Sequence, residues 1–257
     1  MSPSPPQPAA DVQPIRPFGL DAADMEIDLH GLAQPVAAIA VVAACCAAGR
    51  SEVASWTIAR RLDALIDVAI ASLGQRLSSI GTCGRLGCSG LMELVLDLVA
   101  FRGVSTAGDV ACSVEPDRRV TAALPTGEDQ LRWLSGGISD PLTLASGLVR
   151  SVDGEPVADG WWVPAAWLPA IEGAFEAADP LSALELIAVC PECGEENRVA
   201  FDLEAFLLTR LRQRQARLVD EIHCLALHYH WSERDIVAMP AGRRAEYLRR
   251  LGAGGVR

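Results

Sequence analysis

Two pairs of cysteines in this sequence have spacings suited to metal binding. Cys190 and Cys193 lie in a Cys-Pro-x-Cys-Gly turn, which directs two sulfurs toward one ion. Cys83 and Cys88 are separated by four residues, a looser spacing. Because zinc accepts four thiolates in a tetrahedron, we expect Cys83, Cys88, Cys190 and Cys193 to share one structural zinc ion if the two segments face each other.

Two alternatives to this shared site stay open. In the first, the four cysteines are reduced thiols without metal. In the second, Cys190 and Cys193 bind a metal together with Cys224 and His228, but an intervening helix of about 45 Å argues against that set. The remaining four of the eight cysteines are expected to be small buried apolar side chains; they are Cys45, Cys46, Cys112 and Cys224.

The sequence does not favour an enzyme. It contains none of the serine-elbow, phosphate-loop, dinucleotide-binding or His-Glu-x-x-His motifs that mark common catalytic sites. Zinc bound by four cysteines would have no position open for water or substrate, so the metal itself is expected to be structural. The opening stretch, residues 1–17, has no basic segment leading into an apolar core, so we expect a cytoplasmic protein with thiols rather than disulfides.

Each cysteine pair is expected in the turn of a β-hairpin. Strands are predicted over 76–82 and 92–96 around the first pair, and over 184–189 and 198–201 around the second. Nine residues after the second cysteine of each pair comes a matching phrase, Asp-Leu-Val-Ala-Phe at 97–101 and Asp-Leu-Glu-Ala-Phe at 202–206. We interpret this as an internal repeat, with Asp97 and Asp202 each capping a following helix.

Helical spacing of apolar residues predicts a helix over 55–73, with Arg60, Arg61, Asp63 and Asp67 facing water. The apolar run 36–48 is too short to span a bilayer and is expected to be a buried helix, so no membrane partner is expected. Between the repeats, a strand is predicted over 119–124. A helix over 165–178 is expected to be disturbed by Pro169, and Trp161 and Trp162 to pack between the repeats.

The C-terminal third is predicted to be helical. One long helix should run from 203 to 230, a short one should start at Ser232, and a last one should open at Pro240. The fold class is therefore α+β: two related cysteine-bearing β-hairpin/helix units with a zinc-ribbon-like junction, then a long helix and a short helical tail. The expected domains are a disordered arm at 1–17, helices plus first cysteine hairpin at 18–103, a middle insert at 104–180, the second cysteine hairpin at 181–202 and a helical module at 203–257.

The charge of the chain is unevenly placed. The net charge is −11, yet residues 203–257 carry ten Arg against six Asp and Glu, or +4, which leaves −15 on the other 202 residues. A basic tail on an acidic body favours docking onto an acidic partner or onto the protein's own body. Nucleic acid is a less favoured partner, because the overall charge opposes it and the last helix has no base-reading start.

The tail also resembles a known family. Its segments 220–223, 225–226 and 229–233, with Ile236, Met239, 243–244 and 247–248, are similar to the C-terminal signature of the T-even-phage-like baseplate hub assembly proteins. Upstream, 60–65, the hairpin ending at 92–94, 124–126 and 190–206 follow that family's order, so the resemblance covers roughly 33–252. The first cysteine pair departs from the family's usual two-residue knuckle.

This resemblance implies a non-catalytic assembly chaperone or structural component of the baseplate hub of a phage-tail-like contractile injection system, with hub or spike proteins as partners. The alternative is a zinc-ribbon regulator that binds nucleic acid through its arginine-rich tail. The tail is the expected partner-binding element, and its expected contact residues are Arg210, Arg214, Arg217, Glu221, His223, Tyr229, Trp231, Arg243, Arg244 and Tyr247.

Overall fold

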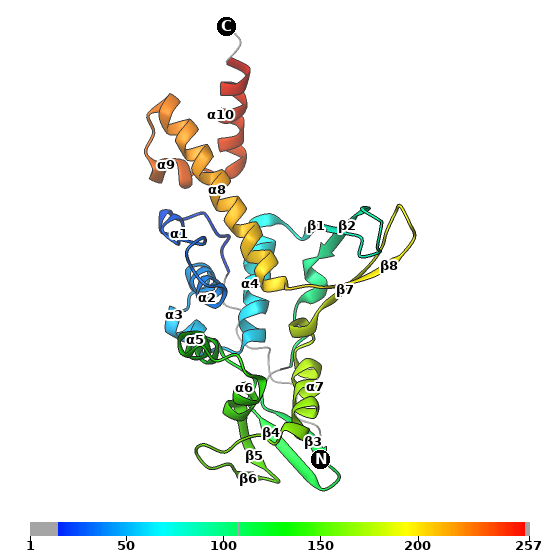
Figure 1. The fold of residues 1–257 in the computed structure, drawn as a ribbon. Helices are drawn as coiled ribbons and strands as arrows, with labels where there is room; N and C mark the ends of the chain where they lie inside the picture. The colour runs from blue at the N-terminus through cyan, green and yellow to red at the C-terminus, as the bar shows by residue number, and fades with distance from the viewer. Residues whose placement is uncertain (1–14, 107, 255–257) are drawn as a thin grey trace, which may run out of the picture.

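The computed structural model describes residues 15–106 and 108–254. It has a mixed α+β architecture of small sheets and helices, which confirms the predicted fold class (Figure 1). A helical body lies at the centre, two β-hairpins lie beside it, a small sheet unit lies at one end, and the helical tail extends at the other. Among the described helices, none combines the length and apolar character needed to cross a bilayer.

The helical body is built from four N-terminal helices and the first half of a long C-terminal helix. Their bounds are α1 (Ala22–Met25), α2 (Gln34–Cys45), α3 (Arg50–Ser55), α4 (Ile58–Leu73) and α8 (Leu203–Tyr229). Apolar side chains at helical spacing bury one face of α4 against α2 and α8, as Leu65, Ile66, Leu207 and Leu211 show. The predicted buried helix over 36–48 is α2.

The polar face predicted for α4 is wrong at Arg61. This side chain has no solvent-exposed surface, and its Nη2 donates to Oε2 of Glu204 on α8 at 2.8 Å. It also donates to the Gln130 side chain at 2.7 Å. Arg61 is therefore an ionic link inside the body. Apolar spacing places a residue on a helix face but does not show a carboxylate that approaches from another part of the chain.

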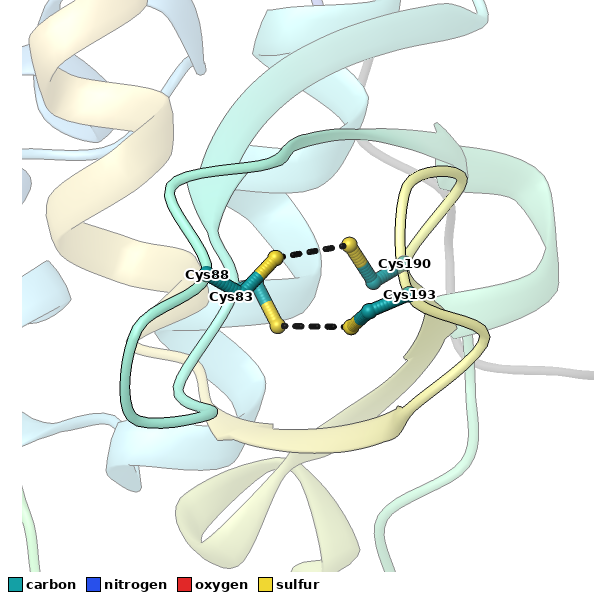
Figure 2. Close-up of side chains that lie close together, drawn as sticks. All are labelled: Cys83, Cys88, Cys190 and Cys193. Atoms are coloured by element: carbon teal, nitrogen blue, oxygen red, sulfur yellow. Dashed lines mark hydrogen bonds between the residues drawn. The ribbon is translucent and has the colours of Figure 1, made fainter.

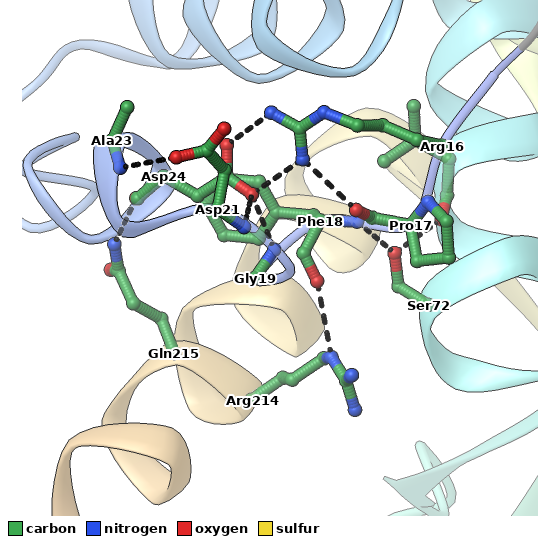
Figure 3. Close-up of polar contacts among 11 residues, drawn as sticks. Arg16, Pro17, Phe18, Gly19, Asp21, Ala23, Asp24, Ser72, Arg214 and Gln215 are labelled. Atoms are coloured by element: carbon green, nitrogen blue, oxygen red, sulfur yellow. Dashed lines mark hydrogen bonds and ion pairs between the residues drawn. The ribbon is translucent and has the colours of Figure 1, made fainter. Parts of the chain in front are cut away.

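The three described residues of the predicted N-terminal arm, 15–17, contact the body, while 1–14 lie outside the described residues. The backbone N–H of Arg16 donates to the Cys45 carbonyl at 3.0 Å. Its guanidinium binds the buried Asp24 carboxylate, with Nη1 and Oδ2 2.6 Å apart. Figure 3 shows this segment held between α4 and α8, where the Phe18 N–H donates to Ser72 of α4.

The two cysteine hairpins have the predicted antiparallel form. Their strands are β1 (Arg76–Thr82) with β2 (Leu91–Asp97), and β7 (Glu185–Val189) with β8 (Glu196–Ala200). In each copy the predicted Asp cap is present. Asp97 accepts a hydrogen bond from the Val99 N–H, and Asp202 accepts one from the Ala205 N–H. The copies then diverge, because the first cap starts one 3₁₀ turn, Leu98–Phe101, and the second starts the long helix α8.

The chain between the hairpins forms a four-stranded antiparallel sheet with helices. The strands pair in sequence order, and the bounds are β3 (Val110–Glu115), β4 (Arg118–Ala122), α5 (Gly127–Gly136), α6 (Pro141–Leu148), β5 (Val149–Val152), β6 (Glu155–Pro156) and α7 (Leu168–Ala178). Short 3₁₀ turns precede and follow α7, at Ala165–Trp167 and Pro180–Ala183.

Two expectations about this unit are wrong. Trp161 packs against Trp167 inside the sheet unit, with ring centroids 6.2 Å apart, and Trp162 is 60% exposed, so neither lies between the repeats. Pro169 does not disturb α7 but sits in its first turn, where a missing N–H costs no helical hydrogen bond.

The tail consists of the second half of α8, then α9 (Glu233–Val237) and α10 (Ala241–Gly254), which confirms the predicted order of one long and two short helices. Ser232 caps α9 by accepting a hydrogen bond from the Asp235 N–H at 3.2 Å, as its sequence predicts. Both short helices pack back on α8 (Figure 1). Ile236 and Val237 are buried there, so the tail has a small core of its own.

Candidate metal centre

The four predicted cysteine ligands come together where the two hairpin turns meet. The Sγ atoms of Cys83, Cys88, Cys190 and Cys193 all lie within 4.8 Å of one another. Figure 2 shows the two pairs entering from opposite sides, each from its own hairpin, with the sulfurs directed toward a common centre. The shared arrangement expected from the sequence is therefore the one that the chain adopts.

The distances between these sulfurs fit a tetrahedral ion. The Sγ atoms of Cys83 and Cys193 are 3.7 Å apart, and those of Cys88 and Cys190 are 3.8 Å apart. Four sulfurs about 2.3 Å from a central zinc would be separated by about 3.8 Å. A disulfide requires about 2.05 Å, and all four cysteines are free. The donor set thus fits a divalent metal that prefers thiolates.

Local backbone structure fixes the second turn. The Cys190 N–H donates to the Glu195 carbonyl and the Gly194 N–H donates to the Cys190 carbonyl, both at 2.9 Å. Gly194 has φ of +73°, a left-handed conformation that glycine adopts without strain. These bonds close the turn predicted from Cys-Pro-x-Cys-Gly and hold both sulfurs on the same side.

The first turn reaches the same geometry over a longer loop. The Cys83 N–H donates to the Gly90 carbonyl at 2.9 Å, and the Gly90 N–H approaches the Cys88 sulfur at 3.4 Å. A Cβ atom on Gly90 would lie 2.6 Å from the Cys190 sulfur, so only glycine lets the two turns approach this closely. The looser spacing of this pair is compatible with ligation.

Asn197 of β8 links the second hairpin to the first. Its amide oxygen accepts a hydrogen bond from the Gly84 N–H at 2.7 Å, and its Nδ2 lies 3.7 Å from the Cys83 sulfur. The same Nδ2 donates to the Glu195 carbonyl at 2.9 Å. Hydrogen bonds of this kind orient ligands around a metal. Sequence analysis did not single out Asn197, although its alternation in β8 places it on the buried side.

The local electrostatics shift the pKa values of Cys88 and Cys193 in opposite directions. The Glu195 N–H is the largest factor that lowers the pKa of Cys193, which falls to about 7. The Gly90 N–H also acts to lower the pKa of Cys88, but hydrogen bonds to the neighbouring sulfurs, chiefly Cys193, together with burial raise it to about 12. A metal ion must displace the protons of these thiols, so its affinity will rise with pH.

The other cysteines lie elsewhere. Cys224 and His228 are not part of the cluster; the His228 ring contacts the Cys224 carbonyl within α8. Cys45 is buried, and burial raises the pKa of its thiol to about 12, as expected of a small apolar side chain. The expectation of a buried side chain is wrong for Cys46, Cys112 and Cys224, which are half-buried. Burial raises the pKa of both Cys46 and Cys112.

Most of the residues expected to bind a partner fall into two groups on the tail, a cleft and an aromatic cluster. Arg210, Arg214, Arg217 and Glu221 line a cleft along α8, and Arg244 of α10 is buried beside them, paired with Glu221 at 2.9 Å. Tyr229, Trp231 and Tyr247 form an aromatic cluster, in which Tyr229 and Trp231 stack with centroids 4.6 Å apart. Arg243 lies over Tyr247, and His223 is exposed on α8. Their role in binding a partner stays a prediction.

The four cysteines can hold a metal ion, but they leave no coordination position open for water or substrate. Four thiolates complete a tetrahedral sphere, so a bound ion would stabilise the junction of the two hairpins rather than activate water. No protein-family model, no curated protein and no solved structure matches the chain.

Proposed function

We propose that this protein is a non-catalytic assembly factor or structural component of the baseplate hub of a contractile, phage-tail-like particle, in which a structural zinc ion joins the two cysteine hairpins. The observation that carries the proposal is the four-sulfur cluster at the turns of the two hairpins. It ties two distant parts of the chain together at the turns of the two hairpins, and the second hairpin leads through β8 into the long helix α8. The assignment to a baseplate hub rests on the sequence resemblance of the tail.

Zinc is the metal that best fits this donor set. Soft thiolate ligands favour zinc over magnesium, calcium or manganese, and four sulfurs at tetrahedral separations match a structural zinc site. An ion there would cross-link hairpins whose ligands are 102 and 110 residues apart in the sequence. The proposed metal therefore holds the turn of the second hairpin to the turn of the first.

Metal analysis of the purified protein tests the site. We expect one zinc per chain in the wild type and loss of that zinc in both Cys83→Ser and Cys190→Ser. Cys112→Ser is the matched control and should keep the metal, because Cys112 is half-buried in the sheet unit and lies outside the cluster. Zinc retained in Cys83→Ser would rule out a shared site.

In the proposed assembly role, the aromatic cluster of the tail contacts the partner. Tyr229, Trp231 and Tyr247 are each half-buried, so part of every ring remains accessible. Partly exposed aromatic side chains of this kind are enriched at protein interfaces. Deletion from Arg210 onward is not a clean test, because Leu211 and Leu218 of α8 are buried.

Co-purification with baseplate hub and spike proteins from the same genomic neighbourhood tests this role. Trp231→Ala should reduce capture of the partner, while Trp162→Ala, which removes an exposed tryptophan from the sheet unit, should not. Circular dichroism and melting temperature verify that both variants are folded. If the folded Trp231→Ala protein captured its partner as well as the wild type, the aromatic cluster would not be the docking element.

A further inference from the structure

A polar cleft of about 310 Å³ runs between the end of α4, the middle of α8 and the start of α10. Its charged lining consists of Arg210, Arg214, Arg217, Arg244 and Glu221. The three α8 arginines follow at four- and three-residue spacing, which places them on one face of that helix. Four guanidinium groups thus face one carboxylate, in a chain whose net charge is −11.

Two of these arginines are engaged by the protein itself. Arg244 is buried and donates to Glu221 at 2.9 Å. It also donates to the carbonyls of Val237, at the end of α9, and Met239, in the link between α9 and α10. Arg210 donates to the Ser78 carbonyl of β1 and to the Gln213 side chain. These two side chains hold the cleft in shape, and Glu221 is neutralised by its pairing with Arg244.

Arg214 and Arg217 retain free donor capacity. Arg214 makes one long hydrogen bond, from Nε to the Phe18 carbonyl at 3.4 Å, and Figure 3 shows its other two nitrogens directed away from that carbonyl. Within 15–106 and 108–254, no carboxylate pairs with either Arg214 or Arg217. Burial and, to a lesser degree, the neighbouring Arg244 lower the pKa of Arg214, and Glu221 opposes this only in part. The cleft therefore concentrates positive charge that the described chain does not neutralise.

A simpler reading is that the arginines neutralise the negative end of the α4 dipole, because α4 ends at Leu73 in this cleft. The hydrogen bonds do not support that reading. Ser72 is the other α4 residue that lines the cleft. Its hydroxyl oxygen accepts a hydrogen bond from the Phe18 N–H, and the hydroxyl donates one to the Val68 carbonyl. Neither Arg214 nor Arg217 donates to a described α4 carbonyl. Because no hydrogen bond ties them to the end of α4, these two guanidinium groups remain available to a ligand.

We propose that this cleft binds the carboxylates of an acidic segment of a partner protein, through Arg214 and Arg217. This inference rests on the proposed assembly function and adds the chemistry of the partner. A guanidinium matches the planar shape of a carboxylate with two parallel hydrogen bonds. A nucleic acid fits less well, because the cleft is short and the chain outside 203–257 carries −15, whereas nucleic acids need many phosphate contacts along an extended surface.

Fluorescence anisotropy with a labelled short poly-glutamate peptide tests the proposal on the full chain at physiological ionic strength. We expect the double variant Arg214→Gln/Arg217→Gln to weaken peptide binding by at least about tenfold, since charge-assisted hydrogen bonds are lost. Arg249→Ala is the control, because it removes one exposed arginine of α10 outside the cleft. Its peptide affinity should stay within about twofold of the wild type, as an exposed charge contributes little.

Several outcomes would overturn the proposal. These are equal peptide affinity of the double variant and the wild type, tighter binding of inorganic phosphate than of the peptide, or tighter binding of a single-stranded DNA oligonucleotide. The single variant Arg217→Gln provides a second measurement, because Arg217 is exposed and its replacement leaves the core unchanged. If hub proteins co-purify with the double variant as with the wild type, the cleft proposal fails while the assembly function stands.

Discussion

Arg61 of α4 and Glu204 of α8 form a buried ion pair, with Nη2 and Oε2 2.8 Å apart. Glu204 lies in the first turn of α8, which follows the second cysteine hairpin, so this pair joins α4 to the start of α8. Gln130 of α5 accepts a further hydrogen bond from the same guanidinium. One side chain thus ties together three segments that lie far apart in the sequence.

We predict that Glu204→Ala lowers the free energy of unfolding by about 3–5 kcal/mol, because it leaves the Arg61 guanidinium buried without a counter-charge. Urea unfolding followed by circular dichroism measures this change. Glu196→Ala is the control, since that exposed carboxylate lies 3.7 Å from Arg198, and its loss should cost less than about 1 kcal/mol. Equal effects of the two substitutions would show that the buried pair has no special weight.

Asn197→Ala should weaken zinc binding by about 10- to 100-fold while leaving the four sulfurs in place, because it removes a hydrogen-bonding group that orients Cys83. Competition with a chromophoric zinc chelator measures the affinity. Arg198→Ala, at the next and exposed position of β8, is the matched control. An unchanged affinity in the Asn197 variant would mean that the hairpin turns alone determine the site.

Gly90→Ala is expected to lower both zinc content and stability. Its new Cβ would lie 2.6 Å from the Cys190 sulfur, which a bound metal would prevent from moving aside, and such overpacking costs about 1–3 kcal/mol. Gly84→Ala tests the same change without the clash, because the nearest atom would be the Asn197 Oδ1 at 3.5 Å. Full zinc occupancy in Gly90→Ala would contradict the close approach of the turns.

The Asp129 carboxylate should stabilise the protein only when it is ionised. Its burial acts to raise the pKa, but hydrogen bonds from the Thr126 N–H and hydroxyl and the ion pair with Arg132 outweigh burial, so the folded-state pKa lies below the ordinary value. The stabilisation is therefore complete above the unfolded pKa of about 4 and disappears as pH falls through the folded value.

Comparing the unfolding free energy of Asp129→Asn with that of the wild type tests this pH dependence. Loss of the hydrogen bonds from Thr126 to this carboxylate and of the ion pair with Arg132 should cost about 0.5–2 kcal/mol at pH near 7. The difference in unfolding free energy between the two proteins should shrink as the pH is lowered toward 3. If the difference in unfolding free energy increased on acidification, the predicted role of the ionised Asp129 carboxylate would be wrong. Asp117→Asn, on the turn between β3 and β4, serves as the surface control.

The sequence was most informative where local chemistry determines local structure. The spacing of the cysteines predicted the four-sulfur cluster. Asp202 and Ser232 were each predicted to cap a helix, and each accepts a hydrogen bond from a backbone N–H three residues later. It was least informative where distant segments meet. The apolar spacing of α4 predicts that Arg61 faces water, because its partner Glu204 is 143 positions away in the sequence. Asn197 and Gly90 gain their roles only once the two hairpins face each other.

The distance along the chain between the two cysteine pairs also determines when the protein can finish folding. Cys83 leaves the ribosome 110 residues before Cys193, which at about 5–20 residues per second amounts to about 5–20 s of synthesis. During that interval only half of the ligand set exists, and a metal held by two thiolates could still be lost to other binders. Closure of the four-sulfur cluster is thus a late, long-range step, and it occurs only in chains whose synthesis has passed the second hairpin.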